Sequence, residues 1–395
     1  MKTLRNKTVR ALGALFACAA LVFGMASCSN GSDTQVVYVP VETSGGGTQS
    51  GGIGTGIGTG GTQSGGNERT QTINGTVYDL VTFGLWPQTI KAANVEVSKQ
   101  CKSKTVGDFT YYKGSDGQWY AEIKETAYQS FYKYSDGTTV AQKSADSYKW
   151  FKVEPIKWRV LTTDYNGTGK KLLLAESILT NCAYYVSDWV EPNRTIGGKT
   201  VYSNNWEHSK VRAFLNGLSY QKKEDGAEQA ACDDFLGKGF LQTAFSDAEL
   251  TKIADTSVDN SARSTNTYDK ANQWHNGNNR WASDTPTTDK VFLLSEQEAT
   301  TMTYGFDEYD DYKGDARHNE SARIRQTTDY AKASGAEQST KDGFGGWWWL
   351  RSPYADDDPD RVQYVGGSGG TGGNSSYMTS RFNYGGVVPA LCVSN

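Results

Sequence analysis

Short segments in which apolar and polar residues alternate recur from about residue 70 to the C-terminus. In IKWRVL (156–161) the apolar residues alternate with Lys157 and Arg159. This period of two predicts a half-buried β-strand with both basic side chains toward solvent. The apolar runs KLLLAES (171–177) and KVFLLS (290–295) predict central strands. The chain is therefore expected to contain many short strands.

Fewer segments carry signals for helices. Ser246 with Glu249, and Ser295 with Glu298, match the capping box, in which the serine and the glutamate satisfy free groups at a helix N-terminus. NNWEHSKVRAFLN (204–216) predicts a helix whose apolar face is formed by Val211, Phe214 and Leu215. Antiparallel short strands with few helices and many irregular loops predict the α+β class.

Two further segments have a distinctive composition. VVPALCV (387–393) predicts a central or terminal strand, in which Pro389 marks an edge or a bulge because proline cannot donate to a strand ladder. The stretch from about residue 255 to residue 290 is strongly polar, which predicts a surface insertion.

The first 70 residues differ in composition from the rest. A basic start precedes ALGALFACAALVFGM (11–25), and MASC ends at Cys28. Residues 1–27 are therefore predicted to be a lipoprotein signal peptide, with Cys28 as the acylated N-terminus of the exported chain. Residues 25–28 match the lipobox, the motif that ends at the acylated cysteine of bacterial lipoproteins. Because Met25 is a loose match at its first position, cleavage by ordinary signal peptidase is the alternative. Residues 28–70 contain GGTQSGG twice and predict a flexible linker, which leaves 71–395 as one globular domain.

Composition and motifs exclude several classes of function. The formal net charge of -4, without a basic stripe, argues against nucleic-acid binding. The three histidines lack metal-ligand spacing and the acidic run 306–320 lacks the EF-hand pattern, so no metal is predicted. The sequence contains no GxSxG, P-loop or HExxH motif. Neither a cofactor nor catalysis is therefore expected.

Cysteines and one tripeptide leave alternatives open. Four cysteines of the domain allow three disulfide pairings, and buried free thiols are the equal alternative. Glu191-Pro192-Asn193 is a tripeptide that sugar-binding C-type lectins use around calcium, but NNWEHS (204–209) does not supply the Trp-Asn-Asp-like partner, so we interpret it as a chance match. The four cysteines are Cys101, Cys182, Cys232 and Cys392.

The C-terminal segment carries the strongest functional signal. GGWWWLRSP (345–353) precedes about thirty residues that are mostly Asp, Gly, Ser, Asn and Tyr, and no Lys, Glu or Trp occurs between Tyr354 and Gly386. This composition is typical of antibody combining sites. A rigid scaffold is expected to order the loop in advance and so to reduce the entropy cost of binding. The expected scaffold residues are Trp347, Trp348, Trp349, Arg351 and Pro353.

Each residue type of this loop has an expected role in binding. Tyrosines supply apolar contact area, the aspartates favour a cationic or hydrogen-bond-donating partner, and glycine and serine allow close approach. The expected ligand contacts are Tyr354, Asp356, Asp357, Asp358, Asp360, Tyr364, Gly367, Ser368, Thr371, Asn374, Ser375, Ser376, Tyr377, Asn383 and Tyr384.

The C-terminal motifs resemble those of a known family. GGWWWLRSP, the V-x-Y-V of 362–365, the Gly/Asn/Ser-rich stretch and GVVPALCV (386–393) resemble the variable region of the variable proteins of diversity-generating retroelements. TFGLWPQT (82–89) and VFLLSEQEA (291–299) resemble a wider bacterial domain family. The resemblance implies a C-type-lectin fold of the formylglycine-generating-enzyme type, in which the first and last strands pair. It also implies a variable region at about 347–393, where adenine-containing codons are rewritten.

The function implied by the resemblance is that of a surface-displayed, ligand-binding lipoprotein without enzymatic activity. It would be anchored by lipid to the outer membrane and would bind an unknown protein or glycan on another cell or host surface, and no nucleic acid. One alternative is an envelope enzyme of the formylglycine-generating, sulfatase-modifying type. That activity needs a pair of cysteines, whereas the C-terminal part offers Cys392 alone. A fixed lectin is the other alternative.

Overall fold

The computed structural model describes residues 70–127, 131–185, 193–221, 232–259, 285–306, 320–353, 361–371, 376–378 and 385–394. The predicted signal peptide, Cys28 and the linker lie outside these residues. No helix within them is long and apolar enough to cross a membrane.

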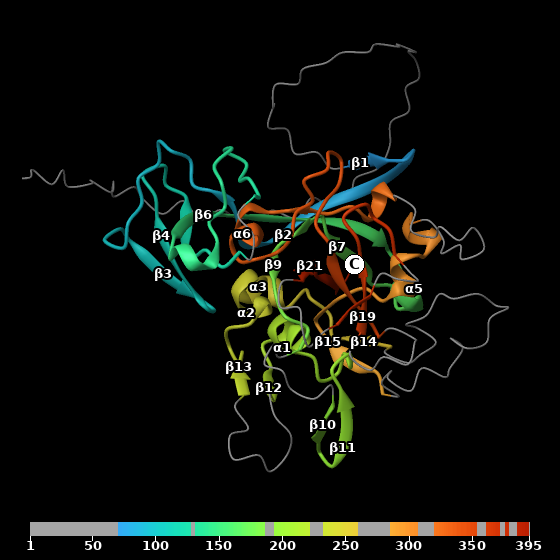
Figure 1. The fold of residues 1–395 in the computed structure, drawn as a ribbon. Helices are drawn as coiled ribbons and strands as arrows, with labels where there is room; N and C mark the ends of the chain where they lie inside the picture. The colour runs from blue at the N-terminus through green and yellow to red at the C-terminus, as the bar shows by residue number, and fades with distance from the viewer. Residues whose placement is uncertain are drawn as a thin grey trace, which may run out of the picture.

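The larger of two main sheets is antiparallel, and the sheets with their few helices confirm the α+β class (Figure 1). Strand β6 (Tyr148–Thr162) is its spine, because one edge pairs with β2 (Thr76–Ile90) and the other pairs first with β5 (Trp119–Lys124) and then with β7 (Lys171–Ala175). The remaining strands are β16 (Val291–Phe292) and β22 (Ala390–Val393) beyond β7, β4 (Phe109–Lys113) and β3 (Ser103–Val106) beyond β5, and β1 (Thr70–Ile73) on β2.

The first and last described strands do not pair, contrary to what the resemblance implies. β1 pairs with β2, whereas β22 pairs with β16 and β7. Strands β7 and β6 therefore lie between β22 and β2 in the sheet. The two ends of the domain still share one sheet, so the N-terminal strands are part of the same hydrophobic core as the C-terminal ones.

The second main sheet has five strands and contains the aromatic C-terminal motif. Its order is β20 (Ser376–Met378), β19 (Arg361–Val365), β18 (Trp348–Pro353), β21 (Gly386–Val387) and β9 (Thr180–Asn181). The segment predicted as one C-terminal strand is two strands in two sheets, β21 in this sheet and β22 in the larger one. Pro389 lies at the crossing, where its carbonyl accepts a hydrogen bond from Ala175 N at 3.0 Å.

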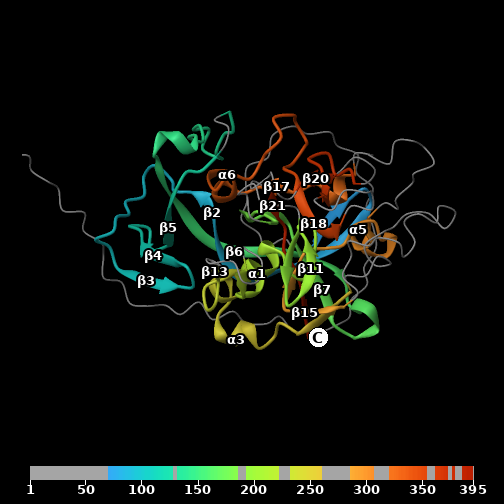
Figure 2. The same ribbon diagram turned by 60° about the horizontal axis from the view of Figure 1, so that its bottom comes forward.

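The helices are short and lie around the sheets (Figure 2). α1 (Lys210–Asn216) begins after Ser209, whose side chain accepts a hydrogen bond from Arg212 N, and its apolar residues pack against the core as predicted. The predicted capping boxes begin α3 (Asp247–Leu250) and α5 (Glu296–Ala299). The other helical segments are α2 (Phe240–Ala244), α6 (Asp329–Ala333) and the 3-10 turns η1 (Lys143–Ala145), η2 (Tyr165–Gly167), η3 (Met302–Tyr304) and η5 (Ser321–Arg323).

Short strand pairs connect the larger elements, and one of them lies at the two ends of the predicted surface insertion, whose residues 260–284 are outside the described part of the chain. β14 (Thr256–Val258) pairs with β15 (Thr287–Asp289), and Val258 and Asp289 are buried. Asp289 is held because it accepts hydrogen bonds from Arg212 Nε at 2.8 Å and Trp206 Nε1 at 3.1 Å. The other pairs are β8 (Ser177–Ile178) with β17 (Gln326–Thr327), β10 (Asn193–Ile196) with β11 (Lys199–Tyr202), and β12 (Ser219–Gln221) with β13 (Cys232–Asp234).

Two strand predictions are corrected by the packing. KVFLLS supplies β16, which has two residues and ends the strand order instead of lying centrally; Leu293 and Leu294 follow it, fully buried. Arg159 was expected to face solvent but is 1% exposed. Its guanidinium donates to Glu176 at 2.6 and 3.0 Å and to Ala322 O at 2.7 Å, so the buried charge is compensated.

The structure distinguishes between the disulfide pairings and the buried thiols that the sequence left open. Cys182 and Cys392 are buried thiols outside any disulfide, whereas Cys101 is disulfide-bonded. Each of the three pairings that the sequence allowed uses both Cys182 and Cys392, so all three are excluded.

Candidate ligand-binding site

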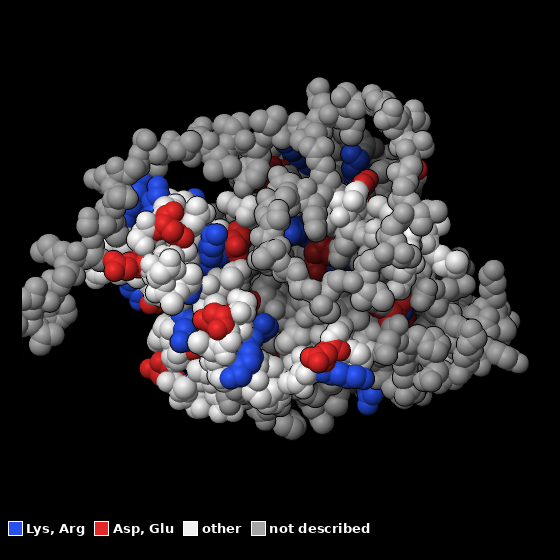
Figure 3. Space-filling view, turned by 90° about the horizontal axis from the view of Figure 1, so that it is seen from above, with Lys and Arg blue, Asp and Glu red and all other residues white. Residues whose placement is uncertain are grey.

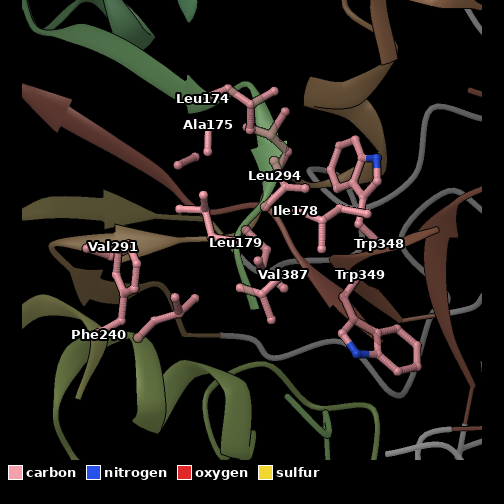
Figure 4. Packing of buried hydrophobic residues seen from close by; sticks show 14 of the residues in the cluster. Leu174, Ala175, Ile178, Leu179, Phe240, Val291, Leu294, Trp348, Trp349 and Val387 are labelled. Atoms are coloured by element: carbon pink, nitrogen blue, oxygen red, sulfur yellow. The ribbon is translucent and has the colours of Figure 1, made fainter. Parts of the chain in front are cut away.

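The aromatic motif forms the centre of the five-stranded sheet, and all three indole N–H groups have acceptors. Trp347 Nε1 donates to Glu337 Oε2 at 2.7 Å, Trp348 Nε1 to Arg323 O at 3.3 Å, and Trp349 Nε1 to Cys182 O at 3.1 Å. The three side chains are at most 4% exposed. Figure 4 shows Trp348 and Trp349 directed to opposite sides of β18, as the alternation of a strand requires.

An aromatic row leads from this strand to one predicted contact residue. The Trp347 and Trp349 rings meet edge to face at 4.8 Å, and Trp349 meets Tyr184 at 5.7 Å. The half-buried ring of Tyr364 lies 5.4 Å from that of Trp347. Tyr364 therefore both packs against the core and presents part of its surface to solvent.

Arg351 joins β18 to helix α5. Its two terminal nitrogens donate to the Glu298 carboxylate at 2.5 and 3.0 Å, and one also donates to Leu293 O at 2.8 Å. Tyr165 donates a further hydrogen bond to Glu298 at 2.6 Å. Desolvation would raise the pKa of Glu298, but the charge and hydrogen bonds of Arg351 outweigh it, so the pKa is lowered and the carboxylate stays ionised. This buried ion pair holds the strand that enters the predicted contact loop.

The middle of the predicted loop is a turn that is fixed to two distant segments, and we call residues 366–371 the clasp. Within it, Gly366 N donates to Gly370 O at 2.9 Å. From outside, Glu320 N donates to Ser368 O at 3.0 Å, Gly345 N to Gly367 O at 2.8 Å, and Arg323 Nε to Gly369 O at 2.6 Å. Each carbonyl of the turn from 367 to 369 therefore has a donor from the surrounding scaffold.

Steric contacts leave no room for a side chain at two positions of the clasp. A Cβ on Gly367 would lie 2.6 Å from Gly345 O, and one on Gly369, at φ +83, would lie 2.0 Å from Glu320 O. Thr371 is 1% exposed. The expectation that Thr371 contacts a ligand is corrected because its side chain is enclosed. Gly367 is restricted to glycine by its neighbours, and Ser368 is half-buried.

The remaining predicted contacts flank the clasp. Ser376 and Tyr377 belong to β20, whose backbone pairs with Gln363 and Val362 of β19. The others lie outside the described residues: Tyr354, Asp356, Asp357, Asp358, Asp360, Asn374, Ser375, Asn383 and Tyr384. The rest of the domain holds the residues that bound these stretches. Pro353 and Thr371 are buried, and Gly385 O accepts a hydrogen bond from Cys182 N at 3.2 Å.

Several residues of the site gave no local signal in the sequence. Asn204 is fully buried and donates from Nδ2 to Arg361 O at 3.1 Å, which fixes the start of β19. Glu320, Arg323 and Gly345 hold the clasp from segments that precede it in sequence. Of these residues only Gly345 has a local signal, because the glycines of GFGG (343–346) indicate that another backbone segment approaches closely. The long sequence separation explains why local patterns missed the others.

The described charged groups do not form a metal site. No group of three or more His, Cys, Asp or Glu side chains gathers in the part of the chain that the structure describes. His275, His318, residues 307–319 of the acidic run, and Glu191 and Pro192 of the tripeptide lie outside it. His208 lies inside it, and burial lowers the pKa of its imidazole. Among the described residues on the face seen in Figure 3, basic and acidic side chains are interspersed.

Comparisons with known proteins cover the C-terminal part of the chain. Residues 168–395 match DUF6273, a domain of unknown function. Comparisons with curated proteins and with solved structures gave no match. The matched region contains the aromatic motif, the clasp and β22 but not β6, the spine of the larger sheet. More than half of the chain matches, and the protein therefore belongs to the DUF6273 family.

Proposed function

We propose that this protein is a surface-displayed binding protein whose C-terminal loops form a diversified ligand site of the retroelement type. In this proposal, an N-terminal lipid at Cys28 anchors the chain to the outer membrane and the linker carries the domain away from the lipid surface. The finer fold assignment, a C-type-lectin fold of the formylglycine-generating-enzyme type, is part of the same proposal. The ligand is a protein or glycan on another cell or host surface.

The observation that carries the proposal is the fixation of the segments that bound the predicted contact loops. The segment of β18 is held by the hydrogen bonds of three indole N–H groups and by a buried ion pair. The clasp is held by three hydrogen bonds from outside the turn. Binding through a glycine-rich loop costs about 1–2 kcal/mol for each residue that becomes ordered. Fixed loop ends reduce that cost without restricting the side chains between them.

The burial of the Cys392 and Cys182 thiols supports a binding function over thiol-based catalysis. Cys392 is fully buried within β22, and burial raises the pKa of its thiol to about 11. A thiol in this state is largely protonated at neutral pH and is shielded from substrate, whereas the thiolate is the nucleophile. Cys182 is also buried. We therefore propose that the protein binds its ligand without transforming it.

Sequencing the coding region in sibling isolates tests the proposal. We expect substitutions to fall within codons 354–360 and 372–384 and to coincide with adenines of a nearby template copy. Gly367, Gly369 and Gly385 should be unchanged because added side chains would collide with their neighbours. Substitutions spread evenly along the gene, or a C-terminal region identical in all isolates, would refute diversification.

A further inference from the structure

Strands β4, β5 and β6 carry a row of aromatic side chains on the sheet face opposite the core. Tyr111, Ala121 and Phe151 point into the core, so the alternate residues Tyr112, Glu122 and Trp150 lie on the other face. Trp150 and Tyr112 are half-buried, and Tyr148, two residues before Trp150, is 53% exposed. We call Tyr112, Trp150 and Tyr148 the aromatic strip.

Two rings of the aromatic strip are in contact, and the strip lies away from the C-terminal loops. The Trp150 and Tyr112 rings meet at 5.4 Å and nearly at right angles across β5. Tyr148 lies on the same face of β6, about 7 Å farther along the strand at two residues' rise. Figures 1 and 2 both show β3 and β4 at the end of the molecule opposite α5 and the β18–β19 region.

The charged groups beside the strip are neutralised in pairs. Lys99 Nζ lies 2.6 Å from Glu122 Oε2, Lys124 Nζ lies 2.6 Å from Asp146 Oδ1, and Lys152 Nζ lies 3.8 Å from Glu154 Oε1. Glu122 is directly opposite Trp150, and Lys124 is directly opposite Tyr148. The strip is thus bordered by hydrogen-bonding groups of both signs, and no excess charge is available to select an ionic ligand.

The residue types on this face exclude an aliphatic interface. Along the paired parts of β4, β5 and β6 the residues on this face are Thr, Tyr, Glu, Lys and Trp, with no Val, Leu, Ile or Met among them. Tyr120 is the buried member of this set, and its hydroxyl donates to Asp116 Oδ2 at 2.7 Å. The core of a protein interface and the binding surface for a lipid are both expected to be more apolar than this. Flat rings flanked by donors and acceptors match a ligand with an apolar face and a hydroxyl rim.

We propose that the aromatic strip is a second binding site, which takes an uncharged pyranose chain. The C–H face of a sugar ring stacks on the exposed ring of Tyr148 or on the accessible part of Trp150 or Tyr112, and the sugar hydroxyl groups bond to Glu122, Lys99 and Lys124. Tyrosine and tryptophan suit this role because each combines an apolar ring with a polar edge. This site lies before residue 168, outside the region that matches DUF6273, and it does not depend on diversification of the C-terminal loops.

Calorimetric titration of the full chain with three soluble probes tests the proposal: uncharged β-linked oligosaccharides of glucose, of N-acetylglucosamine and of mannose. We expect at least one to bind, and Tyr148→Ala to weaken that binding by about tenfold. Because Tyr148 is mostly exposed, the variant should unfold at the wild-type temperature. Met302→Ala is the matched control, since Met302 is 67% exposed and lies outside the strip, and it should bind as the wild type does.

A second variant distinguishes a loss of binding from misfolding. Trp150→Phe keeps a ring in the half-buried position and should reduce binding by a smaller factor than Tyr148→Ala combined with Tyr112→Ala. The proposal is overturned if none of the three oligosaccharides binds, if Tyr148→Ala binds with wild-type affinity, or if only a sulfated oligosaccharide binds. None of these outcomes would bear on the C-terminal loops, whose own test is the comparison of isolates.

Discussion

The backbone of Gly385 lies against the indole of Trp349, so that a Cβ on residue 385 would be 1.8 Å from Nε1 of the tryptophan. The indole has no room to withdraw, because Nε1 donates to Cys182 O and the ring packs against Tyr184. The strand before the predicted contact loops and the strand after them therefore approach to a distance that only glycine permits.

Gly385→Ala should destabilise the protein by about 1–3 kcal/mol, since the extra methyl forces Trp349 or the backbone to shift. Urea denaturation monitored by tryptophan fluorescence measures this change. Gly366→Ala is the matched control in the same segment. Its Cβ would be 3.7 Å from Gly370 O, which is ordinary contact, and its free energy of unfolding should stay within about 0.5 kcal/mol of the wild type. Equal effects of the two substitutions would contradict the close approach.

Removing Arg351 should be costly because it leaves the Glu298 carboxylate buried without its cation. We expect Arg351→Met to lower the free energy of unfolding by about 3–5 kcal/mol. Adding Glu298→Gln to this variant removes the uncompensated charge and should restore part of the loss. A double variant that is less stable than Arg351→Met would show that Glu298 has a role independent of the ion pair.

Glu296 should make stability depend on pH. Burial raises the pKa of this carboxyl to about 8, and the positive charge of Arg323 opposes the shift only in part. The ordinary pKa is about 4.3. As pH rises from about 4.3 to 8, the unfolded chain releases a proton that the folded chain retains, so this group lowers the stability of the folded state over that window.

The change attributable to Glu296 is on the order of 5 kcal/mol at about pH 8, at 1.36 kcal/mol for each pKa unit. Glu296→Gln should therefore gain stability relative to the wild type as pH rises, with little difference near pH 4. Thermal unfolding of both proteins across this range provides the measurement. A constant difference between them at every pH would mean that Glu296 does not titrate abnormally.

Tyr364→Ala should affect stability as well as ligand binding. The Tyr364 ring meets Trp347 at 5.4 Å, and such an aromatic pair contributes about 0.5–1.5 kcal/mol beyond the area it buries. Tyr364→Phe retains this ring contact and should lose less stability. Differential scanning calorimetry separates the two variants. If both unfold at the wild-type temperature, the aromatic row does not extend to Tyr364.

The region that matches DUF6273 should not fold when it is expressed alone. Within 168–395, β7 would lose β6, to which it pairs from Trp158 to Thr162, and one edge of a buried strand would be exposed. Circular dichroism and limited proteolysis of 168–395 and of 70–395 provide the comparison. A protease-resistant, cooperatively unfolding 168–395 fragment would show that the N-terminal strands are an addition to a complete fold.

Local patterns predicted the elements whose cause is local. The capping boxes at Ser246 and Ser295 begin helices as expected, because serine and glutamate three residues apart satisfy each other's helix end. The buried runs at 171–175 and 291–294 were recognised from their apolar residues. The first run forms β7, which lies between β6 and β22 as a central strand, as predicted. The second forms β16 at the end of the strand order, because that order depends on pairings between distant segments.

The sequence alone determined the α+β class, the change in composition near residue 70 and the unusual C-terminal segment. The tertiary structure decided which of those C-terminal residues support the loop. Gly367 and Thr371 looked like contact residues because glycine and threonine are common in binding loops, but Gly345, Glu320 and Arg323 enclose the turn. Arg159 was expected to face solvent because of the period of two in its strand, but Glu176 and Ala322 supply its partners in the core. A residue's type and the local period indicate which environment the residue prefers. Its burial and its hydrogen-bond partners depend on segments that meet only when the chain has folded.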